Sequence, residues 1–194
     1  MYGLSYFYWF IYGTNLDLPA VLGKLVGLGY EIGRATYRGG LVHLEPLPDG
    51  SAAKRVYEDG VVQIFADLNK GALGVYAESY NLVNRGVADL SRALAELSAP
   101  EPPRAELHIS FGFSGNDCRS EKLVLAGEDF VKTGLVLVSG KPQGGEGIYI
   151  LITPAGDGRY ITYIVIGGGW QYTISRLKRA GDLINSLLAF FNCK

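Results

Sequence analysis

The segment APEPP at residues 99–103 constrains the fold most strongly, because it lies near the middle of a chain of 194 residues. Pro100, Pro102 and Pro103 cannot continue a helix or a central strand, since proline lacks the backbone donor that both need. We therefore predict a first repeat over 1–98, a proline-rich linker over 99–103 and a second repeat over 104–194. Together they are expected to form one continuous globular unit.

The first half has a clear order of predicted elements. An apolar strand over 5–12 precedes a helix, since Leu18, Val21, Leu22, Leu25 and Val26 fall at helical spacing. Asn15 or Asp17 is expected to cap this helix, and Pro19 is tolerated in its first turn. Strands are predicted at 30–37 and 41–45, followed by a polar excursion over 46–60. A hairpin over 61–79, turning at residues 69–71, and an amphipathic helix over 83–97 complete the half.

The second half follows a similar but weaker order. Strands are predicted at 105–113 and 131–139, with a short helix over 120–129 between them. A hairpin over 148–166 turns at 154–158, and a final helix covers 177–191. The string GGLVHLEPLPDG resembles TGLVLVSGKPQGG in the other half, which favours an internal duplication. The predicted fold class is α+β, with two similar strand–helix–strands–helix halves that form a curved antiparallel sheet with helices on one face.

Composition narrows the functional class. Hydrophobic residues make up 48% of the chain and charged residues 19%, which is enough apolar surface for a sizeable core. The net charge of -1 opposes binding to a nucleic-acid backbone. The apolar N-terminus has no basic flank and is shorter than the roughly 20 residues that span a bilayer. Two cysteines, Cys118 and Cys193, are too few for a disulfide framework. We therefore expect a soluble, cytoplasmic protein with no membrane partner.

The first half resembles the TATA-box-binding protein family. LDLPAVLGKLVGLGY, residues 16–30, is similar to that family's LDL motif, helix and tyrosine, and GGLVHLEP is similar to its next strand. The resemblance covers residues 5–97 and, more weakly, 105–191. It implies a saddle-shaped fold with a binding role related to transcription.

The sequence also departs from this family. Its base-reading asparagine corresponds to Ile11, and Lys70-Gly71 reverses its glycine-lysine entry to the second hairpin strand. The chain is therefore not an orthologue. A second resemblance is to duplicated effector-binding domains, which hold aromatic, often cationic, small molecules with a central acid among aromatic rings.

Alternation along the predicted strands indicates a candidate surface. Leu107, Ile109, Phe111 and Phe113 are expected in the core, as are Val62, Ile64 and Ala66. In the first strand, Phe7, Trp9 and Ile11 share one face and Tyr6, Tyr8, Phe10 and Tyr12 the other. We predict a tyrosine-rich surface that holds a ligand or partner, formed by Tyr6, Tyr8, Tyr12, Phe65, Tyr76, Glu106 and His108. The alternative is an ordinary amphipathic sheet, or a face buried in a homodimer.

Signals for catalysis, metals and cofactors are absent from the sequence patterns. Neither histidine stands near a recognisable nucleophile motif, so no catalytic residue is assigned. His43 with Glu45, and Glu106 with His108, have spacing that suits half of a metal site, but their strands are not expected to be neighbours. GKPQGGEG lacks the Walker spacing. We therefore predict a non-catalytic binding protein without a metal or cofactor.

Three kinds of partner remain open at this point. Nucleic acid is favoured by the family resemblance and opposed by the charge. A small aromatic or cationic ligand is favoured by the aromatic rings and acids. A homodimer would bury the same face in a second copy.

Overall fold

The computed structural model describes residues 1–13, 16–115, 122–125, 128–131, 134–141 and 145–191. It divides into two compact units, which we treat separately. The N-terminal unit is Ser5–Leu107, and the C-terminal unit combines Met1–Leu4 with His108–Lys194. Cys118 and Cys193 lie outside the described residues.

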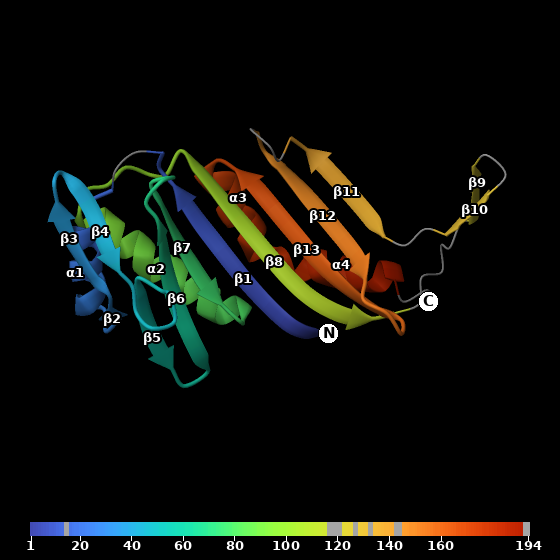
Figure 1. Ribbon diagram of the computed structural model, residues 1–194, viewed down its shortest axis with the longest axis horizontal. Helices are drawn as coiled ribbons and strands as arrows, with labels where there is room; N and C mark the ends of the chain where they lie inside the picture. The colour runs from blue at the N-terminus through green and yellow to red at the C-terminus, as the bar shows by residue number, and fades with distance from the viewer. Residues whose placement is uncertain (14–15, 116–121, 126–127, 132–133, 142–144, 192–194) are drawn as a thin grey trace. The chain divides into compact units, whose positions relative to one another are not determined.

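The N-terminal unit contains an antiparallel sheet in the order β1-β7-β6-β5-β2 (Figure 1). Its strands are β1 (Tyr2–Ile11, of which Tyr2–Leu4 belong to the other unit), β7 (Ala72–Ala77), β6 (Gly60–Asp67), β5 (Ala53–Tyr57) and β2 (Glu31–Ile32). A separate hairpin joins β3 (Arg34–Arg38) to β4 (Leu41–Glu45). The predicted hairpin over 61–79 is confirmed, but β5 lies inside the stretch predicted as an irregular excursion.

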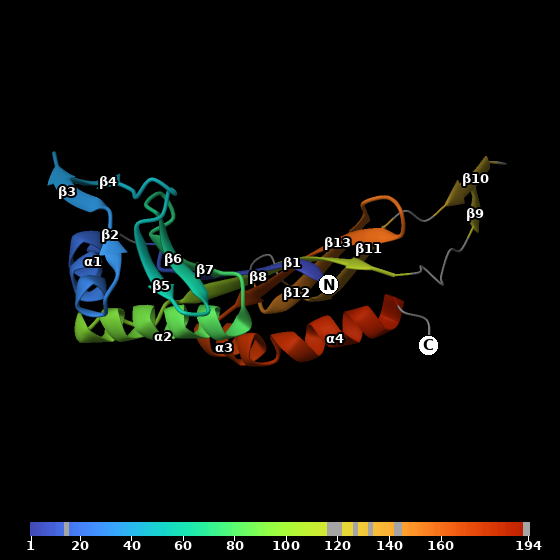
Figure 2. The same cartoon turned by 90° about the horizontal axis from the view of Figure 1, so that it is seen from below.

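Two helices accompany this sheet: α1 begins where the sequence predicts, and α2 begins at Tyr80, ahead of the predicted start at residue 83. In α1 (Leu18–Gly27) the Asp17 carboxylate accepts a hydrogen bond from the Ala20 amide at 3.2 Å, and Pro19 lies in the first turn. In α2 (Tyr80–Glu96) the Ser79 hydroxyl caps the Leu82 amide at 3.3 Å. α2 runs along one face of β6 and β7, and among the described residues no helix lies on the opposite face (Figure 2).

The C-terminal unit contains a sheet in the order β11-β12-β13-β8. Its strands are β8 (Arg104–Ser114, of which Arg104–Leu107 belong to the N-terminal unit), β11 (Leu135–Gly140), β12 (Gly147–Pro154) and β13 (Arg159–Gly168). Two helices, α3 (Trp170–Lys178) and α4 (Ala180–Phe191), follow β13 where one helix is predicted. The inward residues of β8 are buried as predicted, with Leu107, Ile109, Phe111 and Phe113 each at most 1% exposed.

The fold is α+β with antiparallel strands, but the predicted duplication is not confirmed. Where the first half has α1, the second half contains the antiparallel strands β9 (Lys122–Leu125) and β10 (Glu128–Val131). The helix predicted over 120–129 is therefore wrong. Its apolar run Leu123-Val124-Leu125 includes a β-branched residue and suits a short strand as well as a helix, and periodicity alone cannot distinguish them.

Candidate binding surface

One face of β1 is buried and the other reaches solvent. Tyr6, Tyr8 and Tyr12 are only 3%, 0% and 9% exposed, so the prediction that they line a surface is wrong. Tyr6 and Tyr8 lie opposite the buried residues Ala77 and Val75 of β7. Both faces of β1 are aromatic, and alternation within such a strand cannot indicate which face the helix covers. Burial raises the pKa of Tyr12 to about 12 and raises that of Tyr8 further.

Four half-buried rings gather on the helix-free face of the N-terminal unit, and we call them the aromatic cluster: Phe7, Trp9, Phe65 and Tyr76. The Phe7 ring centre lies 4.6 Å from that of Trp9, 5.4 Å from that of Phe65 and 6.0 Å from that of Tyr76. Phe65 and Tyr76 are the two residues of the predicted surface that the structure brings together. Phe7 and Trp9 come from the face of β1 opposite to the one that the sequence predicts for the surface.

Gly74 explains how the rings fit together on this face. It is the cross-strand partner of both Trp9 and Phe65. A Cβ atom at Gly74 would meet the Phe7 ring and lie 2.9 Å from the Trp9 ring. The absence of a side chain on β7 therefore lets rings from β1 lie directly over the backbone.

A hollow of about 610 Å³ adjoins the cluster at Tyr76. Its polar lining includes Gln63 and Ser79, and its charged lining is Asp49, Lys54, Asp59 and Glu78. Lys54 pairs with Asp49 at 3.3 Å, and Arg85 pairs with Asp59 at 2.9 Å. Glu78 is exposed and has no ion pair among the described residues. The hollow therefore combines one aromatic wall with a carboxylate that is not neutralised.

Electrostatics support a negative character for this hollow. The Asp49 carboxylate accepts hydrogen bonds from the Ser51 hydroxyl at 2.6 Å and the Ser51 amide at 3.0 Å. These bonds hold the pKa of Asp49 well below its usual range, so it stays ionised. Burial, and then the negative charge of Glu78, raise the pKa of Tyr76, which keeps its ring neutral.

The remaining two predicted surface residues have partners elsewhere. Arg104 donates two hydrogen bonds to Glu106, at 2.9 and 3.1 Å, so this carboxylate is neutralised by its neighbour on the same strand. His108 lies in the C-terminal unit, where its Nδ1 contacts the hydroxyl of Tyr163 on β13. Both side chains are half-buried and lie on the face opposite Leu107 and Ile109, as alternation predicts.

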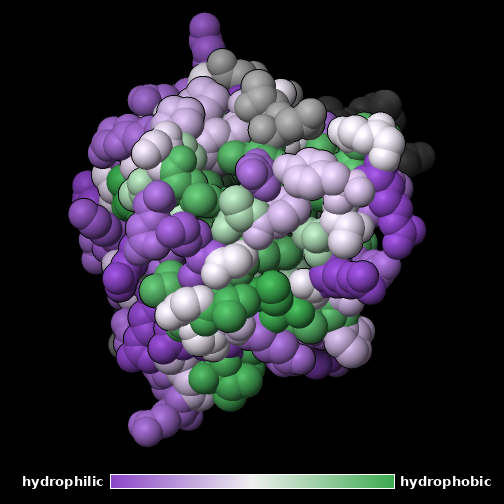
Figure 3. Space-filling view, turned by 90° about the vertical axis from the view of Figure 1, so that its left-hand side faces the viewer, coloured by the Kyte–Doolittle hydropathy of each residue, from purple (hydrophilic) through white to green (hydrophobic). Residues whose placement is uncertain are grey.

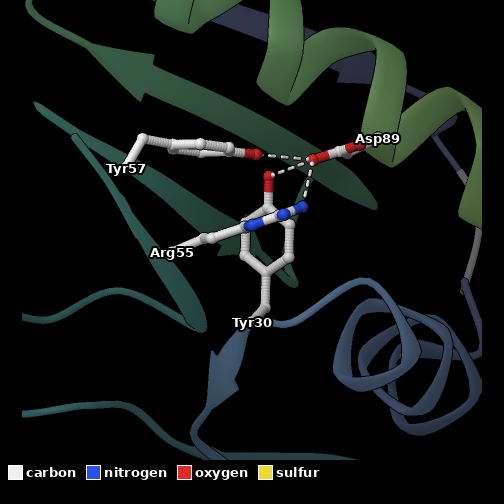
Figure 4. A network of polar contacts seen from close by, with 4 residues as sticks. All are labelled: Tyr30, Arg55, Tyr57 and Asp89. Carbon is white, nitrogen blue, oxygen red and sulfur yellow. Dashed lines mark hydrogen bonds and ion pairs between the residues drawn. The ribbon is translucent and has the colours of Figure 1, made fainter. Parts of the chain in front are cut away.

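A polar network on the helix side joins residues that are distant in sequence, and no local sequence pattern predicts it (Figure 4). Asp89 of α2 accepts hydrogen bonds from the hydroxyls of Tyr57 at 2.9 Å and Tyr30 at 3.1 Å, and Arg55 lies 3.4 Å away. The Arg55 guanidinium also stacks 4.6 Å from the Tyr57 ring centre. Burial, followed by the charge of Asp89, raises the pKa of Tyr30. Because every polar group named here has a partner, we interpret the network as an anchor of α2 to β5.

A second apolar surface lies at α1. Figure 3 shows hydrophobic side chains gathered in the centre of the side on which α1 and β2–β4 lie. Val26 is 50% exposed there, and Lys24 is the single charged residue of α1. We do not assign the site to this surface, because hydrophobic side chains alone do not specify a ligand.

No group of three or more His, Cys, Asp or Glu side chains with the arrangement of a metal site occurs among the described residues. Nor does any helix of the described residues combine the length and apolar character needed to cross a membrane.

Comparisons with known proteins identify no family for this chain. No protein-family model matches the chain, and no curated protein sequence matches it. A solved structure of the TBP of Methanococcus jannaschii is similar to this chain at 15% identity and a TM-score of 0.31. That alignment covers 94% of this chain and 96% of the other.

Proposed function

We propose that this chain is a non-catalytic binding protein, and that its hollow beside Tyr76 holds a flat, positively charged small molecule. The observation that carries the proposal is the adjacency of the Tyr76 ring and the Glu78 carboxylate on the helix-free face. A planar cation over a tyrosine ring gains about 0.5–2 kcal/mol, depending on how far it is desolvated. The carboxylate adds attraction and selects for positive charge.

The aromatic cluster extends this surface beyond the hollow. The Phe7 ring centre lies 6.0 Å from that of Tyr76, and the Phe65 ring centre lies 5.4 Å from that of Phe7, so the rings continue outward from Tyr76. Stacking on such rings tolerates different ligand shapes, since it depends on area more than on directed hydrogen bonds. A nucleic-acid backbone fits less well, because Glu78 would repel phosphate, and Lys54 and Arg85 are already paired with Asp49 and Asp59.

Fluorescence anisotropy with two dyes of similar shape and opposite charge tests the proposal. We expect rhodamine 6G, which is cationic, to bind at least about tenfold more tightly than anionic fluorescein, a difference of about 1.4 kcal/mol. Glu78→Gln and Tyr76→Leu should each weaken rhodamine binding by roughly 3- to 10-fold. Asp157→Asn removes an exposed carboxylate in the C-terminal unit and should leave binding unchanged.

A labelled TA-rich duplex belongs in the same assay. Salt-sensitive binding of the duplex, with no preference between the dyes, would contradict the proposal and favour a nucleic-acid partner. Equal binding of both dyes, unaffected by Glu78→Gln, would also contradict it.

A further inference from the structure

The helix-free face of the C-terminal unit carries six neighbouring side chains without charge on three strands. The register places outward side chains side by side in two rows: Val138, Tyr149 and Val165, then Val136, Leu151 and Tyr163. Val136 and Val138 are 53% and 60% exposed, and they are the outermost members of their rows. Burial of such side chains is favourable in proportion to the apolar area that is removed from water. Val136 and Val138 of β11 therefore offer apolar surface that a partner could bury.

β11 is also an edge strand of this sheet. Among the described residues it pairs with β12 on one side and with no strand on the other. Its sequence LVLVSG contains no charge and no proline, the two features that usually protect an exposed edge. The edge of the N-terminal unit differs, because β2 is two residues long and carries Glu31.

The sequence of β11 matches a second copy of itself. An antiparallel pair centred on Leu137 places Val136 opposite Val138 of the second copy, and Leu137 opposite its own equivalent. In this register even-numbered residues pair with even-numbered ones and odd with odd. The helix-free faces of the two copies therefore lie on the same side of the joined sheet. The four valines form one continuous apolar patch, and the leucines meet on the helix side. No like charges face each other, because the strand has none.

We propose that two copies of this chain associate through β11, with antiparallel pairing centred on Leu137. The pairing is isologous, so it closes at two copies, whereas one-sided addition of strands would continue into a filament. It joins the sheets of two C-terminal units edge to edge. The inference is independent of the small-molecule site, since all of its residues lie in the C-terminal unit.

Sedimentation velocity of the full chain over a wide range of concentration tests the association. We expect a species of twice the chain mass of 21.0 kDa that dissociates on dilution. Val138→Lys should shift the protein to the monomer mass at every concentration, since it brings two new charges against apolar neighbours. Leu41→Lys, at a strand position of the N-terminal unit that is at least as exposed, should leave the dimer intact.

Ile161→Lys distinguishes edge pairing from stacking of the two faces. Ile161 is 53% exposed on the same face but lies on β13, two strands from the edge. Edge pairing predicts that this variant still dimerises. Loss of the dimer in both Ile161→Lys and Val138→Lys would indicate face-to-face contact and overturn the proposal, as would a wild-type monomer or a Val138→Lys dimer. Circular dichroism verifies that each variant is folded.

Cysteine cross-linking tests the register directly, in a chain with Cys118→Ser and Cys193→Ser. Leu137→Cys should form a disulfide-linked dimer under mild oxidation, because directly paired Cα atoms lie about 4.5–5.5 Å apart. Leu135→Cys is the matched control, since its equivalents would be roughly 14 Å apart along the strand. Cross-linking through Leu135→Cys in place of Leu137→Cys would overturn the register.

Discussion

Replacement of Asp89 by alanine should destabilise the N-terminal unit by about 2–4 kcal/mol. The side chain is 22% exposed, and one of its oxygens, Oδ2, accepts from the Tyr57 hydroxyl at 2.9 Å and the Tyr30 hydroxyl at 3.1 Å. A hydrogen bond to a charged acceptor is worth about 1.5–3 kcal/mol when it is buried. Tyr30 is 4% exposed and should contribute at that level.

The other contributions are smaller. Arg55 is 33% exposed, so its ion pair with Asp89 should add less than about 1 kcal/mol. The alanine regains helix propensity of roughly 0.5 kcal/mol within α2. The two tyrosine hydroxyls also interact with each other, which recovers part of the loss. These effects keep the expected value below the sum of three full charged hydrogen bonds.

Urea denaturation followed by Trp9 fluorescence measures this value. Trp9 lies in the N-terminal unit and Trp170 in the other, so a Trp170→Phe background reports on the N-terminal unit alone. Asp89→Asn keeps an acceptor oxygen and should cost only about 1 kcal/mol. Arg92→Ala, at an exposed position of the same helix, should cost less than about 0.5 kcal/mol. If Asp89→Ala were no more destabilising than Arg92→Ala, the anchoring role of the network would be refuted.

Three further predictions follow from packing and burial. Gly86→Ala should destabilise the chain by about 1–3 kcal/mol despite better helix propensity, because its Cβ would clash with Val75 and lie 2.6 Å from Val62; urea denaturation measures the loss. Gly74→Ala should displace the rings of Phe7 and Trp9 and shift the Trp9 emission to longer wavelength, with little loss of stability, because half-buried rings can move. Raising the pH should unfold the protein, because the raised pKa of Tyr12, about 12, gives stability that is complete below pH 10 and is lost as the pH rises toward 12. Absorbance of ionised tyrosine should therefore rise together with loss of circular dichroism, and full ionisation of a folded protein would contradict this.

Much of the N-terminal unit could be predicted because its local signals agree. Asp17 and Pro19 define the start of α1, and Ser79 precedes a helix with clear amphipathic spacing. The inward residues of β6, Val62 and Ile64, are both fully buried, as alternation indicates. In these segments propensity, capping and periodicity all favour the same structure.

The strand β5 shows where local signals fail. Ala53-Lys54-Arg55-Val56-Tyr57 follows a turn rich in proline and glycine and carries two adjacent basic residues, which is unusual for a strand. Its stability comes from pairing with β6 over five positions, from Ala53 with Ile64 to Tyr57 with Gly60. Lys54 and Arg55 have partners on opposite faces, Asp49 and Asp89 respectively. These partners are distant in sequence, so the strand cannot be identified from its own residues.

The candidate surface depends on which face of β1 is buried, and the residues of β1 do not indicate this. Both faces of this strand carry aromatic side chains of similar size, so burial of either face would satisfy alternation. The strand β7 holds the missing information, because its residues alternate between Val75 and Ala77 on one side and Gly74 and Tyr76 on the other. A glycine inside a strand indicates that bulky groups approach the backbone on its side. Once Gly74 is placed opposite Trp9, the rings of Phe7 and Trp9 must lie on the face of Tyr76 and Phe65, and the tyrosines of β1 must face the helix.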